Sequence, residues 1–222
     1  MRYVIFLWLL IGATVFCTPS IYGPTGLIEI PSALPIEYKK INASVDYVSA
    51  RVFSGDNTSP NVFYKFNFGS FENWELGILS DSLLERGVLV NMKYFLISDQ
   101  TEYPLSFAAG IQQIGSKNDM MLYLVTSKRL SGGMTLHFGF RSIFWPAINT
   151  SLMGGSEYYV TENLSIMAEI MSDKDKRYGL NVGVKMMVYN DVFLRIHALD
   201  AVTSQFMRDI RFTVGVSIAK FI

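Results

Sequence analysis

The sequence holds a single cysteine, Cys17, among 222 residues. One cysteine excludes an intrachain disulfide and any metal site built from cysteine ligands. Charge is scarce as well, because Lys, Arg, Asp and Glu make up only 17% of the chain, whereas about 25% is usual for soluble domains. The formal net charge is zero and no basic stripe is present, so we expect no nucleic-acid partner.

Long apolar runs are also missing. The longest, residues 3–16 (YVIFLWLLIGATVF), is shorter than the roughly 20 residues that a membrane-spanning helix needs. This run follows the positive Met1-Arg2 pair and ends before Thr18-Pro19, which is the pattern of a secretory signal peptide. We therefore expect residues 1–17 to be a signal peptide cleaved after Cys17. Lipidation of Cys17 and a retained N-terminal anchor are the alternatives.

What the chain has in place of apolar runs is alternation, clearest in its last residues, 209–222 (DIRFTVGVSIAKFI). Ile210, Phe212 and Val214 share one face, and Arg211 and Thr213 share the other, which is the period of a β-strand with unlike environments on its two sides. A terminal strand of this kind needs partners on both edges. We predict that it closes a β-barrel by pairing with the strands at 41–47 and 192–198.

The same pattern recurs upstream and predicts one antiparallel barrel of about twelve strands over residues 39–222. Longer polar connections alternate with mostly shorter ones, as in bacterial outer-membrane barrels. The Gly154-Gly155 pair makes the strand at 152–160 the weakest. The predicted strands are 41–47, 61–68, 74–78, 88–96, 105–112, 120–124, 134–141, 152–160, 164–170, 178–186, 192–198 and 209–222.

Alternation alone does not say which face meets water. A soluble periplasmic β protein would turn its apolar face inward. Two features favour the outer membrane of a diderm bacterium: the apolar faces carry almost no charge, and the polar faces are rich in Gly, Ser, Asn and Thr. A third is that aromatic residues recur towards strand ends, where interfacial girdles lie; they are Tyr47, Tyr64, Trp74, Tyr94, Phe138, Tyr158 and Tyr178.

The polar face would then line the barrel interior. Two interpretations stay open: a polar pore with a mildly cationic wall that passes small solutes, or a salt-bridged interior that braces the barrel and closes it. Twelve strands fall between the eight of filled barrels and the 16 to 18 of open porins. The predicted lumen-facing polar residues are Asp46, Lys65, Glu75, Lys93, His137, Arg141, Glu157, Glu169, Lys185, Arg195, His197 and Arg211.

Catalytic, cofactor and metal sites are not predicted. His137 and His197 lack recognisable ligand spacing for a metal, and no serine stands in a G-x-S-x-G context. We therefore expect a protein that is not an enzyme, with an outer-membrane hydrolase as the alternative.

Residues 18–38 precede the barrel. Within them, G-x-T-G-L-I-x-x-P-S-A (residues 23–33) resembles the opening of the YjbH-type outer-membrane proteins, which are associated with exopolysaccharide production. The resemblance implies polysaccharide-export components as partners, besides outer-membrane lipid and the barrel-assembly machinery. From the residues themselves, the stretch Thr25–Ala33 is either an extra strand or a segment packed at the periplasmic mouth or in the lumen. A structural or adhesive surface barrel is the alternative function.

Overall fold

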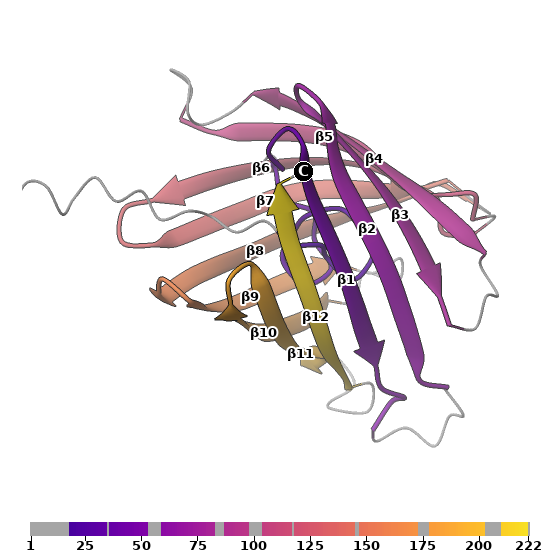
Figure 1. Cartoon of the computed structure of the whole chain (residues 1–222). Helices are drawn as coiled ribbons and strands as arrows, with labels where there is room; N and C mark the ends of the chain where they lie inside the picture. Colours follow the sequence, from indigo (N-terminus) through magenta and orange to yellow (C-terminus); the bar gives the residue numbers. More distant parts are fainter. Residues whose placement is uncertain are drawn as a thin grey trace, which may run out of the picture.

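The computed structural model describes residues 18–34, 36–52, 59–82, 87–97, 104–116, 118–144, 147–172, 178–202 and 210–221. The expected signal peptide, including Cys17, lies outside the described residues, as do the middles of several connections between strands. Figure 1 shows the described strands arranged around a central axis, with the first strand beside the last.

Twelve antiparallel strands form a closed barrel, in which each strand pairs with its neighbours in sequence and β1 pairs with β12. This confirms the predicted fold. The strands are β1 (Lys40–Val48), β2 (Asn61–Phe71), β3 (Trp74–Asp81), β4 (Val88–Ile97), β5 (Ser106–Ile114), β6 (Met121–Leu130), β7 (Met134–Ile143), β8 (Asn149–Thr161), β9 (Leu164–Ser172), β10 (Tyr178–Tyr189), β11 (Val192–Val202) and β12 (Arg211–Phe221).

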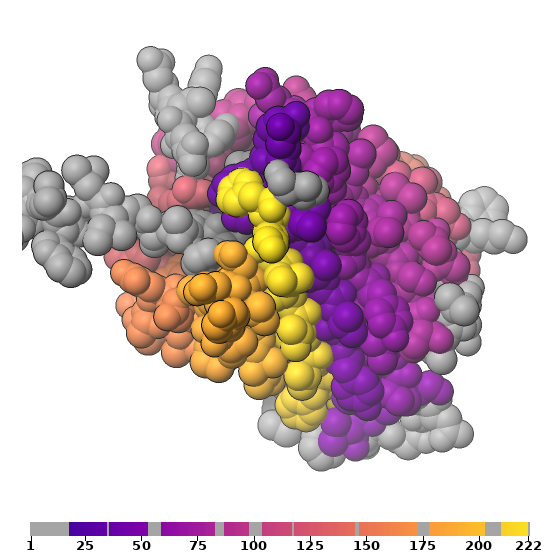
Figure 2. Space-filling view, in the orientation of Figure 1, coloured from indigo at the N-terminus to yellow at the C-terminus, as the bar shows by residue number. Residues whose placement is uncertain are grey.

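The closing strand pairs as its pattern predicts. Val214 in β12 stands opposite Tyr47 in β1 and opposite Ile196 in β11. In the space-filling view, β12 lies directly against β1 along its length (Figure 2). Both edges of β12 are therefore paired, and the sheet has no open edge.

The two faces of the barrel differ as a membrane requires. Outward-facing side chains are large and apolar, and Phe138 and Tyr178 expose 58% and 57% of their surface. Inward-facing side chains such as Asp46 and Arg195 are fully buried. A closed barrel with an apolar exterior leaves no unpaired main-chain group in the hydrocarbon. Separately, no helix among the described residues is long and apolar enough to cross a membrane.

One strand is longer than predicted. The Gly154-Gly155 pair predicts a weak strand at 152–160, and β8 is 13 residues long and pairs continuously with β7 from Met134 to Ile143. Pairing on both sides overrides the low strand propensity of glycine. Gly155 also has a packing reason, because a Cβ atom there would lie 3.0 Å from Cδ2 of Leu27.

Residues 18–34, which we name the plug, lie inside the barrel (Figure 1). The plug is held by two isolated β-bridges, Pro19 with Thr25 and Gly26 with Pro31, and is not a strand of the barrel. Gly26 is required at the second bridge, since a Cβ atom would overlap the carbonyl oxygen of Ile30. Of the places left open for Thr25–Ala33, the structure shows the lumen.

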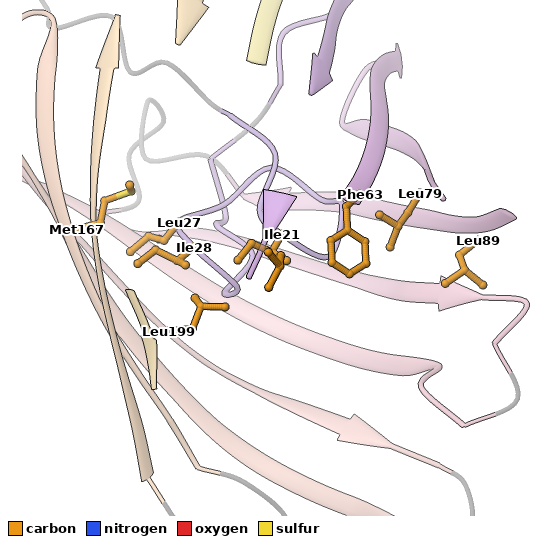
Figure 3. Packing of buried hydrophobic residues seen from close by; sticks show 9 residues of the cluster. Ile21, Leu27, Ile28, Phe63, Leu79, Leu89, Met167 and Leu199 are labelled. Atoms are coloured by element: carbon orange, nitrogen blue, oxygen red, sulfur yellow. The ribbon is translucent and has the colours of Figure 1, made fainter. Parts of the chain in front are cut away.

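Apolar side chains from the plug pack against apolar side chains from the wall. In one cluster, Ile21, Leu27 and Ile28 lie in a row between Met167 on one side and Phe63, Leu79 and Leu89 on the other (Figure 3). In a second, Ile30 and Ala33 pack with Phe95, Tyr123, Val125, Met153 and Met171. The interior is therefore a packed core rather than a uniformly polar lining.

Candidate functional site

The candidate site is the barrel interior. Of the twelve polar residues assigned to it from the sequence, Arg141 and Arg211 are half-buried. The other ten are buried: Asp46, Lys65, Glu75, Lys93, His137, Glu157, Glu169, Lys185, Arg195 and His197. Isolated charges cannot be buried at this depth without partners, so each must be explained by what it contacts.

Asp46 stands between two cations. Its carboxylate pairs with Lys65 on β2, and its Oδ1 atom lies 2.7 Å from Nη2 of Arg195 on β11. Both cations also bind the plug. Nη1 of Arg195 donates to the carbonyl oxygen of Pro19, and Nζ of Lys65 donates to that of Ser20 at 2.6 Å. The triad thus fixes the first residues of the plug.

A second pair, Glu75 and Lys93, clasps Thr25. The two side chains are 2.8 Å apart and almost fully buried. Glu75 accepts hydrogen bonds from the main-chain N–H of Thr25 at 2.7 Å and from its hydroxyl at 2.5 Å. Lys93 donates to the carbonyl oxygens of Thr25 at 3.0 Å and Ser32 at 3.3 Å. A neutral turn of the plug therefore completes the coordination of a buried ion pair.

The carboxylate of Glu169 accepts hydrogen bonds from consecutive main-chain N–H groups of the plug. Ile28, Glu29 and Ile30 donate to its two carboxylate oxygens at 3.2, 2.9 and 3.1 Å. The side-chain amide of Asn181 adds a fourth bond at 2.8 Å. Successive N–H groups that converge on one anion form a concave anion-binding nest. Here the anion belongs to the wall and the nest to the plug.

Two further ion pairs join residues of the wall to each other. Glu157 lies 2.6 Å from Nζ of Lys185 and accepts a 2.6 Å hydrogen bond from the hydroxyl of Ser165. At the rim, Arg211 lies 3.3 Å from Asp200, with both side chains about one-third exposed. The first pair joins β8 to β10 across β9, which carries Ser165, and the second joins the neighbouring strands β11 and β12.

The two histidines each contact a different hydroxyl group. Nδ1 of His137 lies 2.8 Å from Oγ of Ser127, and Nδ1 of His197 lies 2.9 Å from Oγ1 of Thr213. Ser127 also accepts the N–H of Ala33 at 2.8 Å, so its hydroxyl is held under the plug. Among the described residues, no three His, Cys, Asp or Glu side chains form a group that could hold a metal ion.

Glu29 is the plug's own buried acid, with 7% of its surface exposed. Burial raises the pKa of this carboxyl; Arg211 and Arg141 oppose the shift, Asp200 adds to it, and a hydrogen bond from Tyr22 opposes it. Removal from water disfavours the charged form of a carboxylic acid. Plug docking therefore favours protonated Glu29.

The barrel resembles known porins in three dimensions. It superimposes on the KdgM porin with a TM-score of 0.61 and 15% identity over 82% of this chain and 99% of that one. The fold is that of outer-membrane porins. The NanC porin (TM-score 0.54, 11% identity, 82% and 99% coverage) and the COG4313 outer-membrane channel from Pseudomonas putida F1 (0.53, 9%, 84% and 97%) are also similar.

At the level of sequence, no family model and no curated protein matches the chain. The resemblance of residues 23–33 to YjbH-type proteins therefore stays a prediction. The porin fold makes the barrel interior the candidate functional site.

The sequence did not predict the contacts between the wall and the plug. The polar residues of the wall were readable from alternation, but their partners lie up to 176 residues away, as with Pro19 and Arg195. The available signal was the composition of residues 18–34, in which Pro19, Pro24 and Pro31 forbid a regular strand while the isoleucines require burial.

Proposed function

We propose that the protein is an outer-membrane channel for small polar solutes, and that the plug closes it in the state described here. The size and strand arrangement are those of the porin fold. The plug fills the interior that a porin of this fold would use for passage. Movement of the plug would then be the step that opens the channel.

The observation that carries this proposal is the way the plug is attached. Main-chain hydrogen bonds of residues 18–34 run within the plug, as from Ile21 N to Ile28 O at 2.7 Å and from Leu27 N to Ile30 O at 2.9 Å. The described contacts that bind it to the wall come from wall side chains, such as those of Lys65 and Glu169. Among the hydrogen bonds of the described residues, no ladder bond of the barrel would break if the plug moved as a body.

Single-channel conductance in a planar bilayer tests the proposal. A disulfide between Ala33→Cys and Ser127→Cys is designed to lock the plug to the wall where the N atom of Ala33 lies 2.8 Å from Oγ of Ser127. The background carries Cys17→Ala, which leaves only the engineered pair. We expect openings in the reduced protein that vanish on oxidation and return with a reductant. A chain without residues 18–34 should conduct continuously.

A permanently sealed structural or adhesive barrel is the second candidate. The two apolar clusters favour it, because Ile28 and Ile30 are fully buried between plug and wall. Burial of such side chains stabilises the docked state by about 1.5–3 kcal/mol each. Absence of conductance in the reduced protein and in the chain without residues 18–34, with both folded, would favour the sealed barrel over the channel.

Two narrower proposals concern the solute and partners. One KdgM structure is described as a complex with disordered oligogalacturonate, so oligogalacturonate is a suitable first solute for conductance block. The resemblance of residues 23–33 to YjbH-type proteins supports a role with polysaccharide-export components. Neighbouring genes for polysaccharide synthesis would support that role, and neighbours of unrelated function would weaken it.

Absence of enzymatic activity is likewise a proposal. The Ser127–His137 pair uses Nδ1 of the imidazole and lies beneath Ala33, while the carboxylate of Glu157 is bound by Lys185 and Ser165. A hydrolytic site needs a nucleophile, a base and an orienting group within reach of substrate. A lipid- or peptide-hydrolysis assay with His137→Ala as its control tests this expectation.

A further inference from the structure

We propose that the interior wall of the barrel is a peptide-binding site, which recognises the main chain of a short folded-back peptide and can bind the plug sequence supplied as a separate molecule. This inference deepens the proposed function and rests on it only in requiring that the plug can leave. Its ligand class is a short peptide with an apolar, glycine-containing turn.

The hydrogen bonds between wall and plug are made mostly to main-chain atoms of the plug. From the wall, cations and amides donate to plug carbonyls, and carboxylates and a hydroxyl accept from plug N–H groups. The pairs are Arg195 to Pro19 O, Lys65 to Ser20 O, Asn67 to Gly23 O, Lys93 to Thr25 O and Ser32 O, Glu75 to Thr25 N, Glu169 to Ile28, Glu29 and Ile30 N, and Ser127 to Ala33 N.

Main-chain recognition is the general means by which proteins bind peptides. Every buried N–H and C=O group needs a partner, and a wall that supplies those partners gains affinity without depending on side-chain identity. Specificity then comes from the few side chains that the wall reads. Here they are the hydroxyl of Thr25, which Glu75 and Lys93 bind, and the apolar Leu27, Ile28 and Ile30.

The binding groups are held in place by the wall itself. Asn181 donates to Glu169 at 2.8 Å and accepts the N–H of Asp200 at 2.8 Å, so the carboxylate is oriented by wall atoms. Lys93 is likewise held by Glu75 at 2.8 Å. A site whose groups are already oriented loses less entropy when it binds its ligand. The wall is therefore organised to accept a peptide that arrives separately.

The experiment uses the folded full chain. A protease site inserted in the exposed segment Glu37–Lys39 allows the plug to be cut from the barrel after folding in detergent. Size-exclusion chromatography then reports whether the cut plug stays bound, and fluorescence anisotropy reports exchange with a labelled peptide of residues 18–38. Neither measurement depends on conductance, so a failed channel proposal and a failed peptide proposal give different results.

Two matched glutamates provide the control. Glu169→Gln removes the charge that three plug N–H groups bind, whereas Glu157→Gln changes a buried carboxylate that binds Lys185 and Ser165 of the wall. Charge-assisted hydrogen bonds are the stronger class. We expect Glu169→Gln to weaken peptide binding at least about tenfold, and Glu157→Gln to leave it within about twofold.

The outcomes separate cleanly. Retention of the cut plug, or its saturable replacement by the labelled peptide, together with loss in Glu169→Gln, supports the site. A peptide carrying Gly26→Val should not bind, because its side chain would overlap the Ile30 carbonyl in the turn. Loss of the cut plug without rebinding overturns the proposal. Equal binding by a scrambled peptide, or equal weakening by both glutamine variants, overturns it as well.

Discussion

Replacing Asp46 with asparagine tests whether the interior ion pairs hold this barrel together. Asp46 is fully buried on β1 and pairs with Lys65 of β2 and, at 2.7 Å, with Arg195 of β11. Asparagine keeps the size of the side chain and removes its charge, so two buried cations lose their shared anion. Removing one partner from a buried ion pair costs about 3–5 kcal/mol.

A matched control lies at the rim. Asp200 pairs with Arg211 at 3.3 Å, but their side chains are 32% and 31% exposed. Water and salt screen such a pair, whose net worth is about 0–1 kcal/mol. Asp200→Asn makes the same chemical change as Asp46→Asn, on the same barrel and also beside an arginine. The difference between the two variants therefore isolates the effect of burial.

The measurement is the free energy of unfolding in detergent micelles, from urea titrations followed by heat-modifiable gel mobility and intrinsic fluorescence. We expect Asp46→Asn to lose at least about 2 kcal/mol more than Asp200→Asn. The double variant Asp46→Asn/Arg195→Met should recover part of the loss, because only one cation then remains unpaired. Equal losses for the two single variants would refute the reasoning that buried charge organises the interior.

Three further predictions concern space, pH and closure. Gly215→Ala should destabilise the barrel by about 1–3 kcal/mol, because a Cβ atom at this position would overlap Oδ1 of Asp46. At Gly154 the nearest atom to such a Cβ is 3.8 Å away, so Gly154→Ala should be tolerated. Thermal unfolding of the two variants compares these effects. Burial raises the pKa of Glu29 above 4.5, so its contribution to docking is full below pH 4.5 and is lost as the pH rises through the raised pKa. Channel openings should therefore increase as the pH rises through that raised pKa, and Glu29→Gln should abolish the increase. Deleting residues 220–222 removes the Ile41–Lys220 and Lys40–Phe221 pairs of the closing seam and should lower outer-membrane levels on immunoblots more than deleting the charged connection 173–177; equal levels would contradict the seam assignment.

Much of the barrel could be read from the sequence because alternation is a local property. Each strand shows its period within a few residues, and the parity of Asp46, Lys65 and Arg195 places them on one face without knowledge of any partner. Closure by residues 209–222 followed from the need of a terminal amphipathic strand for two neighbours. The boundaries moved by a few residues, as for β11, which extends to Val202.

The plug could not be placed by the same reasoning, because its position depends on contacts that no local pattern contains. Residues 18–34 have no sustained period, and from the sequence Thr25–Ala33 could equally be an extra strand or a packed segment. Gly155 is a residue of β8 whose type reflects the position of the plug. As a strand residue it suggested weakness, whereas its actual role is to leave room for Leu27. A glycine on the inward face of a strand can mark the approach of another segment.

The position of the plug in the chain also orders the assembly of the molecule. Residues 18–34 precede every described strand, yet Ile28 is hydrogen-bonded to Glu169, 141 residues later in the chain, and Pro19 to Arg195, 176 residues later. Contacts of such long sequence separation form slowly, because a large loop must close before they contribute. A segment that is synthesised before every described strand is thus among the last to form its contacts. Docking of the plug and joining of β1 to β12 belong to the same late stage, and a chain that stops before β9 can complete neither.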